Sequence, residues 1–182
     1  LAGEGVRFSR AWCQSPICQP SRASLITGRY PHELDVLRNF GKDFDTSWPT
    51  FMKSLKAAGY TTANVGKTHY HKNGLIPPSG PQRDLREKGA YIAQFGFDHV
   101  VEEFDRYVHA IDGVQTHYTE YLREQGVFEH YRDQLKKIWR LTPTHWDAVT
   151  SQLSQEHDLT SFLTREALGW VDRQSSEQPF FL

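Results

Sequence analysis

The chain has 182 residues, of which 24% are charged and 13% are aromatic, and its formal net charge is −1. This length suggests one domain with enough chain to bury a core, and the aromatic content argues against disorder. Near-neutral charge argues against a nucleic-acid binder, and no apolar run approaches the ~20 residues of a membrane-spanning helix. The two cysteines, Cys13 and Cys18, match neither a disulfide framework nor a zinc pattern.

Both ends of the sequence look cut, so we expect an internal piece of a longer protein. Gly5 is typical of a residue that ends a helix, and the alternation over Val6–Trp12 predicts a strand after it. At the other end, an apolar strand begins at Phe180 and the sequence stops inside it. The sequence shows no signal segment, and its absence says nothing about location.

Helices and strands are expected to alternate along the chain. The pattern predicts helices over Pro20–Thr27 and Pro49–Ala58, one or two surface helices within Thr116–Trp139 broken at Gly126, and a helix after the N-cap Asp158. It predicts strands over Tyr60–Val65, within Ala93–Val101 and from Phe180, and a loop over Lys72–Gly89. This alternation favours an α/β fold with a mainly parallel sheet flanked by helices.

The segment from Cys18 to Arg29 carries the strongest chemical signal. It places a small nucleophilic side chain just before a helix, whose free N–H groups favour an anion. Arg22, one turn into that helix, adds a planar cation suited to sulfate or phosphate oxygens. For a cysteine taken alone, a buried and inert thiol is the commoner case.

Cys-x-Pro-Ser-Arg followed by Ala-Ser-Leu-x-Thr-Gly-Arg, residues 18–29, resembles the signature of the type I sulfatases in the alkaline phosphatase-like superfamily. Further segments in the expected order resemble landmarks of that family: Glu4–Phe8, Gly28–His32, Ala58–Thr62, Gly66–His69, Gly96–Asp98 and Pro179–Leu182. The resemblance implies the sulfatase fold and places residues 1–182 in the N-terminal catalytic domain. The stretch 102–157 matches none of these landmarks and is assigned to a family-variable insertion.

The resemblance also implies that a formylglycine-generating enzyme oxidises Cys18 to formylglycine. The hydrated aldehyde carries two hydroxyls: one attacks sulfur and expels the alcohol, and deprotonation of the other then expels sulfate and regenerates the aldehyde. A thiol or a serine lacks the second hydroxyl. Cys13 departs from the motif and is expected to be structural, and its spacing from Cys18 does not favour a thiol-redox pair.

Three further residues receive catalytic roles from the resemblance. Arg22 would hold the formylglycine hydrate, Lys67 would bind the sulfate oxygens, and His69 would hydrogen-bond the hydrate or the sulfate and pass a proton. Arg38 and Asn39 lie in a region that lines the pocket in related enzymes, so they are expected to contact substrate, although an exposed loop arginine is ordinarily just solvated. His71 is left open between a strand face and substrate contact.

The family binds one Ca²⁺, sometimes Mg²⁺, through oxygen ligands. The resemblance places only one of these ligands in this sequence, the formylglycine oxygen at Cys18, and does not make Asp35, Asp43 or Asp45 ligands. The remaining acidic ligands are expected before Leu1 and after Leu182. We therefore expect these 182 residues alone to be inactive.

The leading interpretation is a sulfatase that hydrolyses a sulfated small molecule or a sulfated polysaccharide. A phosphonate monoester or phosphodiester hydrolase of the same superfamily is the alternative, because both substrates present similar tetrahedral anions. A non-catalytic, anion-binding pseudoenzyme or truncated product also stays open. A periplasmic or secreted location is a family expectation only.

Overall fold

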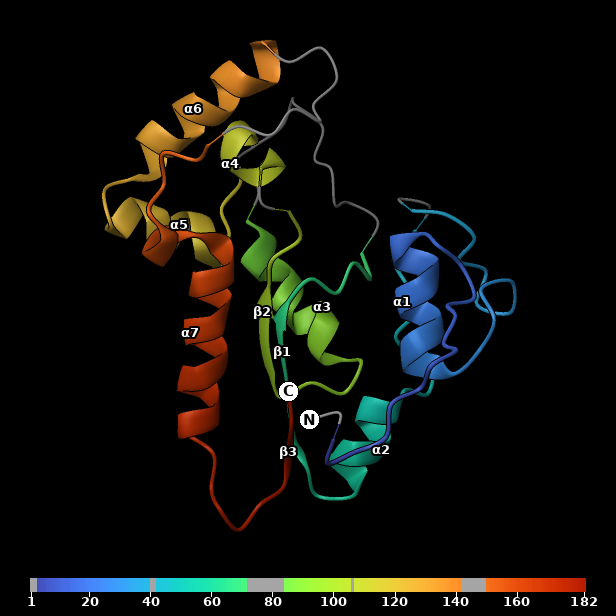
Figure 1. The fold of residues 1–182 in the computed structure, drawn as a ribbon. Helices are drawn as coiled ribbons and strands as arrows, with labels where there is room; N and C mark the ends of the chain where they lie inside the picture. The colour runs from blue at the N-terminus through green and yellow to red at the C-terminus, as the bar shows by residue number, and fades with distance from the viewer. Residues whose placement is uncertain (1–2, 40–41, 72–83, 106, 142–149) are drawn as a thin grey trace.

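The computed structural model describes residues 3–39, 42–71, 84–105, 107–141 and 150–182, and it is built around a three-stranded parallel sheet (Figure 1). The strands β1 (Thr61–Gly66), β2 (His99–Glu102) and β3 (Phe180–Phe181) lie in the order β2-β1-β3. The helices are α1 (Cys18–Thr27), α2 (Phe51–Ala57), α3 (Gly89–Ala93), α4 (Val108–Asp112), α5 (His117–Glu124), α6 (Phe128–Leu141) and α7 (Leu159–Asp172), with short 3₁₀ turns at Leu85–Lys88 and Gln155–His157. The α/β class expected from the sequence is confirmed.

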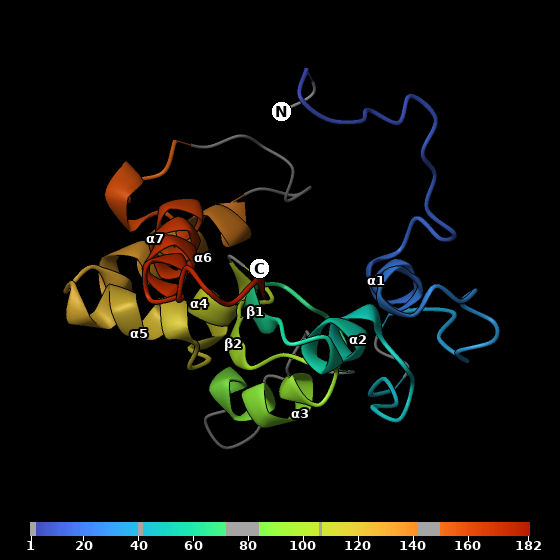
Figure 2. The same ribbon diagram turned by 90° about the horizontal axis from the view of Figure 1, so that it is seen from below.

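The sheet is covered on both faces, as a parallel sheet requires (Figures 1 and 2). On one face, α1, α2 and α3 enclose an apolar cluster that includes Ala23, Met52 and Phe95. On the other face, α7 packs against β1 beside α4, α5 and α6, with Leu122 and Phe162 in the centre of a second cluster. Residues of the stretch 102–157 therefore form much of the apolar core on the α7 side of the sheet.

The turn before β2 is attached to the start of β1 by hydrogen bonds. The Thr62 hydroxyl donates to the carbonyl oxygen of Gly96 at 2.6 Å, and the Thr62 amide donates to the Asp98 carboxylate at 3.0 Å. Asp98 also forms an ion pair with Lys56 of α2. These bonds set the register in which Ala63 lies opposite His99 and Gly66 lies opposite Glu102.

Several predicted elements are confirmed, with shifts of one or two residues. Helix α1 begins at Cys18, two residues before the predicted start, and α2 begins after the N-cap Thr50. The predicted break at Gly126 separates α5 from α6, and Asp158 caps α7 by accepting a hydrogen bond from the Thr160 amide.

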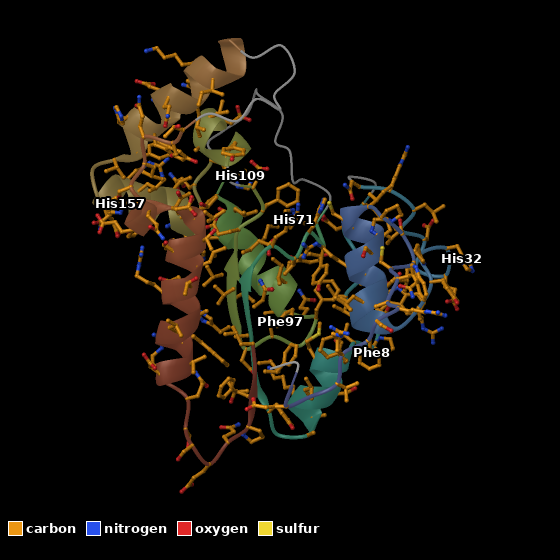
Figure 3. All side chains as sticks on the ribbon, in the orientation of Figure 1. Phe8, His32, His71, Phe97, His109 and His157 are labelled. Atoms are coloured by element: carbon orange, nitrogen blue, oxygen red, sulfur yellow. The ribbon has the colours of Figure 1, made fainter. Side chains whose placement is uncertain are left out.

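Two predictions are wrong. Residues 6–12 form no strand, and Val6, Phe8 and Trp12 are about 80% exposed, because the segment runs away from the sheet and pairs with no strand in the described part of the chain (Figure 2; Phe8 is labelled in Figure 3). Strand-like alternation forms a strand only where a neighbour satisfies the backbone. The loop predicted over Lys72–Gly89 ends early: residues 72–83 lie outside the described ranges, but Asp84 caps a 3₁₀ turn that leads into α3.

Among the helices that the structure describes, none has the length and apolar character needed to cross a membrane.

Substituting Gly96 tests the close packing of the β2 turn against α2. A Cβ at Gly96 would lie 2.5 Å from the Lys53 amide nitrogen, and the residue has a φ of +107°. We expect Gly96→Ala to lower the free energy of unfolding by about 3 kcal/mol, measured by urea denaturation. The matched control is Gly126→Ala, which has a positive φ of +71° but no atom within 4 Å of the added Cβ, and which should cost about 1 kcal/mol. Equal losses would contradict the packing explanation.

Candidate active site

The four residues predicted to be catalytic lie together where α1 begins and β1 ends. Cys18 is the exposed first residue of α1, and Lys67 and His69 follow β1 directly. The Lys67 ammonium nitrogen lies 4.0 Å from the Cys18 sulfur. The Arg22 guanidinium donates to the main-chain oxygen of Lys67 at 2.5 Å, which holds α1 against the loop after β1. The position agrees with the rule that parallel sheets bind ligands at the carboxyl ends of their strands.

The first turn of α1 offers fewer free amides than the sequence suggests. The Gln19 amide donates to the side-chain oxygen of Asn39 at 2.9 Å, Pro20 has no N–H, and the Ser21 amide bonds to the carbonyl oxygen of Ile17. Asn39 therefore occupies the Gln19 amide, and anion binding by the helix N-terminus beside Cys18 stays a prediction. The positive charge available to an anion comes mainly from the side chains of Lys67 and Arg22.

His69 is a buried histidine in an unusual backbone conformation. Its φ is +57°, its side chain is 1% exposed, and its ring packs edge-on against Phe104 with the centroids 4.3 Å apart. Burial lowers the pKa of His69 to about 3, and the neighbouring basic groups of Lys67, His71 and Arg22 act in the same direction. At neutral pH the imidazole is uncharged, so one ring nitrogen can accept a hydrogen bond and the other can donate one.

A buried carboxylate binds the main chain of the loop that follows β1. Glu102, at the end of β2, accepts hydrogen bonds from the amides of Thr68 at 2.8 Å and His69 at 3.3 Å. His71, which the sequence left open, is fully buried with Nε2 3.4 Å from Glu102. Figure 3 shows His71 near the end of the sheet where β1 and β2 finish. Sequence reasoning missed Glu102 and Phe104; the available signal was a carboxylate directly after a predicted strand.

Arg38 and Asn39 belong to the segment that contacts Gln19, the second residue of α1. Arg38 lines a surface pocket of about 470 Å³ together with Gln19 and Lys42. Lys42 is paired with Asp35 at 2.5 Å, and this bond holds the pKa of the Asp35 carboxyl below its usual range. Asn39 bonds to the Gln19 amide, so its side chain serves as an external cap of α1. Substrate contact by either residue stays a prediction.

The residues that the structure describes form no metal site by themselves. Within the described ranges, no group of three or more His, Cys, Asp or Glu side chains is arranged to hold a metal ion. Asp35 is engaged with Lys42, and Asp45 accepts a hydrogen bond from the Ser47 amide. Cys18 is the one residue of this sequence that the resemblance assigns to the metal, and the metal itself stays a prediction. Cys13 is exposed and its thiol donates to the Ser15 carbonyl oxygen.

The fold places the basic side chains of Lys67 and Arg22 in one loop region with Cys18, at the carboxyl end of a parallel sheet. The sulfatase family model matches residues 1–182, and the chain belongs to that family. It is 27% identical over 189 residues to an arylsulfatase of Hemicentrotus pulcherrimus, covering 100% of this chain and 30% of that protein.

An N-acetylglucosamine-6-O-sulfatase of Bacteroides thetaiotaomicron is 39% identical over 69 residues, which cover 38% of this chain and 12% of that protein. Among solved structures, the phosphonate monoester hydrolase of Agrobacterium radiobacter superimposes with a TM-score of 0.58 at 20% identity, covering 93% of this chain and 31% of that one. This structural likeness shows the fold alone. The chain thus spans less than a third of the length of these relatives.

The lowered pKa of His69 predicts a specific pH dependence of stability. Between the ordinary pKa of about 6.5 and the folded value of about 3, the unfolded chain binds a proton that the folded chain does not. Stability contributed by neutral His69 is therefore present above about pH 6.5 and is lost as the pH falls toward 3. Urea denaturation of the full-length protein should show a steeper loss of stability between pH 7 and pH 4 than in a His69→Gln variant. Parallel pH curves for the two proteins would argue against a buried neutral imidazole.

Proposed function

We propose that the protein is a sulfuric ester hydrolase whose nucleophile is formylglycine made from Cys18, acting with a bound Ca²⁺ or Mg²⁺. The observation that carries this proposal is the meeting of Cys18 and Lys67, 4.0 Å apart, with Arg22 bonded to the Lys67 main chain, in a chain of the sulfatase family. The family resemblance assigns a catalytic role to each of these residues.

The side chains around Cys18 have distinct tasks in this proposal. The modified residue supplies the attacking oxygen, and Lys67 holds an oxygen of the sulfate and balances its charge. Arg22 orients the modified residue and fixes the loop that bears Lys67. His69, uncharged at neutral pH, accepts or returns a proton at the modified residue or at the sulfate.

Family membership alone supports the proposals on the metal, the maturation step and the substrate. The metal would be completed by acidic ligands from outside these residues, and a formylglycine-generating enzyme would act on Cys18. The substrate would be a sulfated small molecule or a sulfated polysaccharide; one relative is named for acting on N-acetylglucosamine 6-O-sulfate. A periplasmic or secreted location goes with this family proposal.

A phosphonate monoester or phosphodiester hydrolase is the second candidate. The structural likeness to the Agrobacterium radiobacter enzyme favours keeping it. A lysine and an arginine beside the nucleophile suit a sulfate and a phosphodiester equally well, because both are tetrahedral anions with similar oxygen spacing.

Peptide mass spectrometry across Cys18, joined to turnover assays, tests the proposal. The full-length protein should be produced together with a working formylglycine-generating enzyme and assayed with an aryl sulfate and an aryl phosphodiester. We expect an aldehyde at residue 18, preferential hydrolysis of the sulfate, and no turnover in Cys18→Ala. Cys13→Ala is the matched control and should retain activity, since Cys13 is exposed and bonded only within its own turn.

Each unfavourable result has a distinct meaning. An intact thiol at Cys18, with the maturation enzyme active on a control substrate, removes the nucleophile and leaves an anion-binding pseudoenzyme. A preference for the phosphodiester replaces the sulfatase proposal with the second candidate.

Substituting Lys67 tests the anion site. Lys67→Met removes the ammonium beside Cys18 while keeping a long side chain, and we expect kcat/KM to fall by about 10²–10³-fold in steady-state assays. Lys88→Met is the control. Both lysines lie over an aromatic ring, Lys67 4.4 Å from the centroid of Phe104 and Lys88 5.8 Å from the centroid of Tyr91, but Lys88 is on the 3₁₀ turn before α3. Equal activities in the two variants would rule out the role given to Lys67.

A further inference from the structure

We propose that Glu102 and Phe104, at the end of β2 and just after it, are positioning residues that hold Lys67 and His69 in their working places. This inference rests on the proposed function. It assigns a role in the site to residues within the stretch 102–157, which the sequence alone assigns to a variable insertion.

Glu102 fixes the backbone of the β1 loop. Its side chain is 1% exposed, and its two oxygens accept from the consecutive amides of Thr68 and His69. His69 has a φ of +57°, a conformation that a residue with a side chain adopts at a cost unless its surroundings enforce it. The bonds to Glu102 hold the peptide groups on both sides of Thr68 and so restrain this conformation.

Phe104 fixes the two side chains that leave the loop. The Lys67 ammonium nitrogen lies 4.4 Å from the centre of the Phe104 ring, within the range of a cation–π contact. The His69 ring meets the same phenyl group edge-on at 4.3 Å. One buried ring therefore contacts both proposed sulfate-binding side chains, and it fixes their positions relative to each other.

The stability of the fold does not by itself explain why a carboxylate is buried beneath the loop after β1. A carboxylate buried at 1% exposure is expensive to desolvate, and apolar side chains in its place are often as stable or more so. The loop keeps the carboxylate, a buried histidine at 3.4 Å and a strained backbone in one place, next to the proposed nucleophile. Strain retained beside a reactive residue is typical of a site that is held ready for its ligand.

The chain offers a matched control for each residue. Glu103 is an adjacent buried carboxylate that accepts from the Tyr118 amide at 2.7 Å, at the start of α5, and burial raises its pKa to about 8. Glu103→Gln therefore replaces a group that is mostly protonated at neutral pH. Phe128 is a buried phenylalanine with the Arg123 guanidinium 4.1 Å from its ring centre, in the cluster on the α7 face of the sheet.

The test combines kinetics with hydrogen exchange in the full-length protein. We expect Glu102→Ala to lower kcat/KM by about 100-fold and Glu102→Gln by about tenfold, because glutamine keeps one acceptor oxygen for the loop amides. Phe104→Leu should lower it by about tenfold. Glu103→Gln and Phe128→Leu should stay within about twofold of wild type, even where they lower the melting temperature as much. The amides of Thr68 and His69 should exchange faster in the Glu102 variants only.

The outcomes separate this inference from the proposed function. If the wild type turns over substrate and the variants and controls alike lose activity only in step with melting temperature, the positioning role is overturned and the sulfatase proposal stands. If the wild type hydrolyses neither ester, the proposed function fails and exchange decides the positioning. Faster exchange at Thr68 and His69 in Glu102→Gln but not in Glu103→Gln supports the positioning role, and unchanged exchange overturns it.

Discussion

The parallel pairing of β1 with β2 is the constraint on which the site depends. In this register Gly66 lies opposite Glu102, and the Glu103 amide donates to the Gly66 carbonyl oxygen. Because both strands finish at the same level, the loop that follows β1 lies directly above the residues that end β2. A shift of register by one residue would turn Glu102 away from the loop and leave the amides of Thr68 and His69 without their acceptor.

The charges of the site are distributed unevenly. The Lys67 ammonium lies 4.0 Å from the Cys18 sulfur and the Arg22 guanidinium bonds to the Lys67 main chain, while the buried Glu102 accepts hydrogen bonds from the main chain of the loop. The neighbouring cations and burial keep His69 neutral. This half of the site is therefore suited to an anion, and in the described ranges no acidic cluster is arranged to hold a metal beside it.

Strand formation at the two ends of the sequence also depends on a neighbouring strand. Val6, Phe8 and Trp12 alternate as in a strand, yet they are about 80% exposed and no strand lies beside them in the described part of the chain. In contrast, Phe180 and Phe181 form a strand, although it has only two residues, because β1 lies beside them and pairs with their backbone. An alternating sequence favours a strand, but a strand forms only where a neighbouring strand pairs with its backbone.

The sequence by itself determined the α/β class, the helices around Pro20, Pro49 and Asp158, and the break at Gly126. Those features depend on glycine, proline and capping residues that act on their own neighbours in the chain. The motif at Cys18 and the Gly66–His69 segment also indicated the family by their residue pattern alone. Only the tertiary structure decided that Asn39 takes up the Gln19 amide, that His71 is buried, and that Glu102 and Phe104 support Lys67 and His69. These contacts join residues some 20 to 37 positions apart, so they exist only once the strands have paired and the helices have packed.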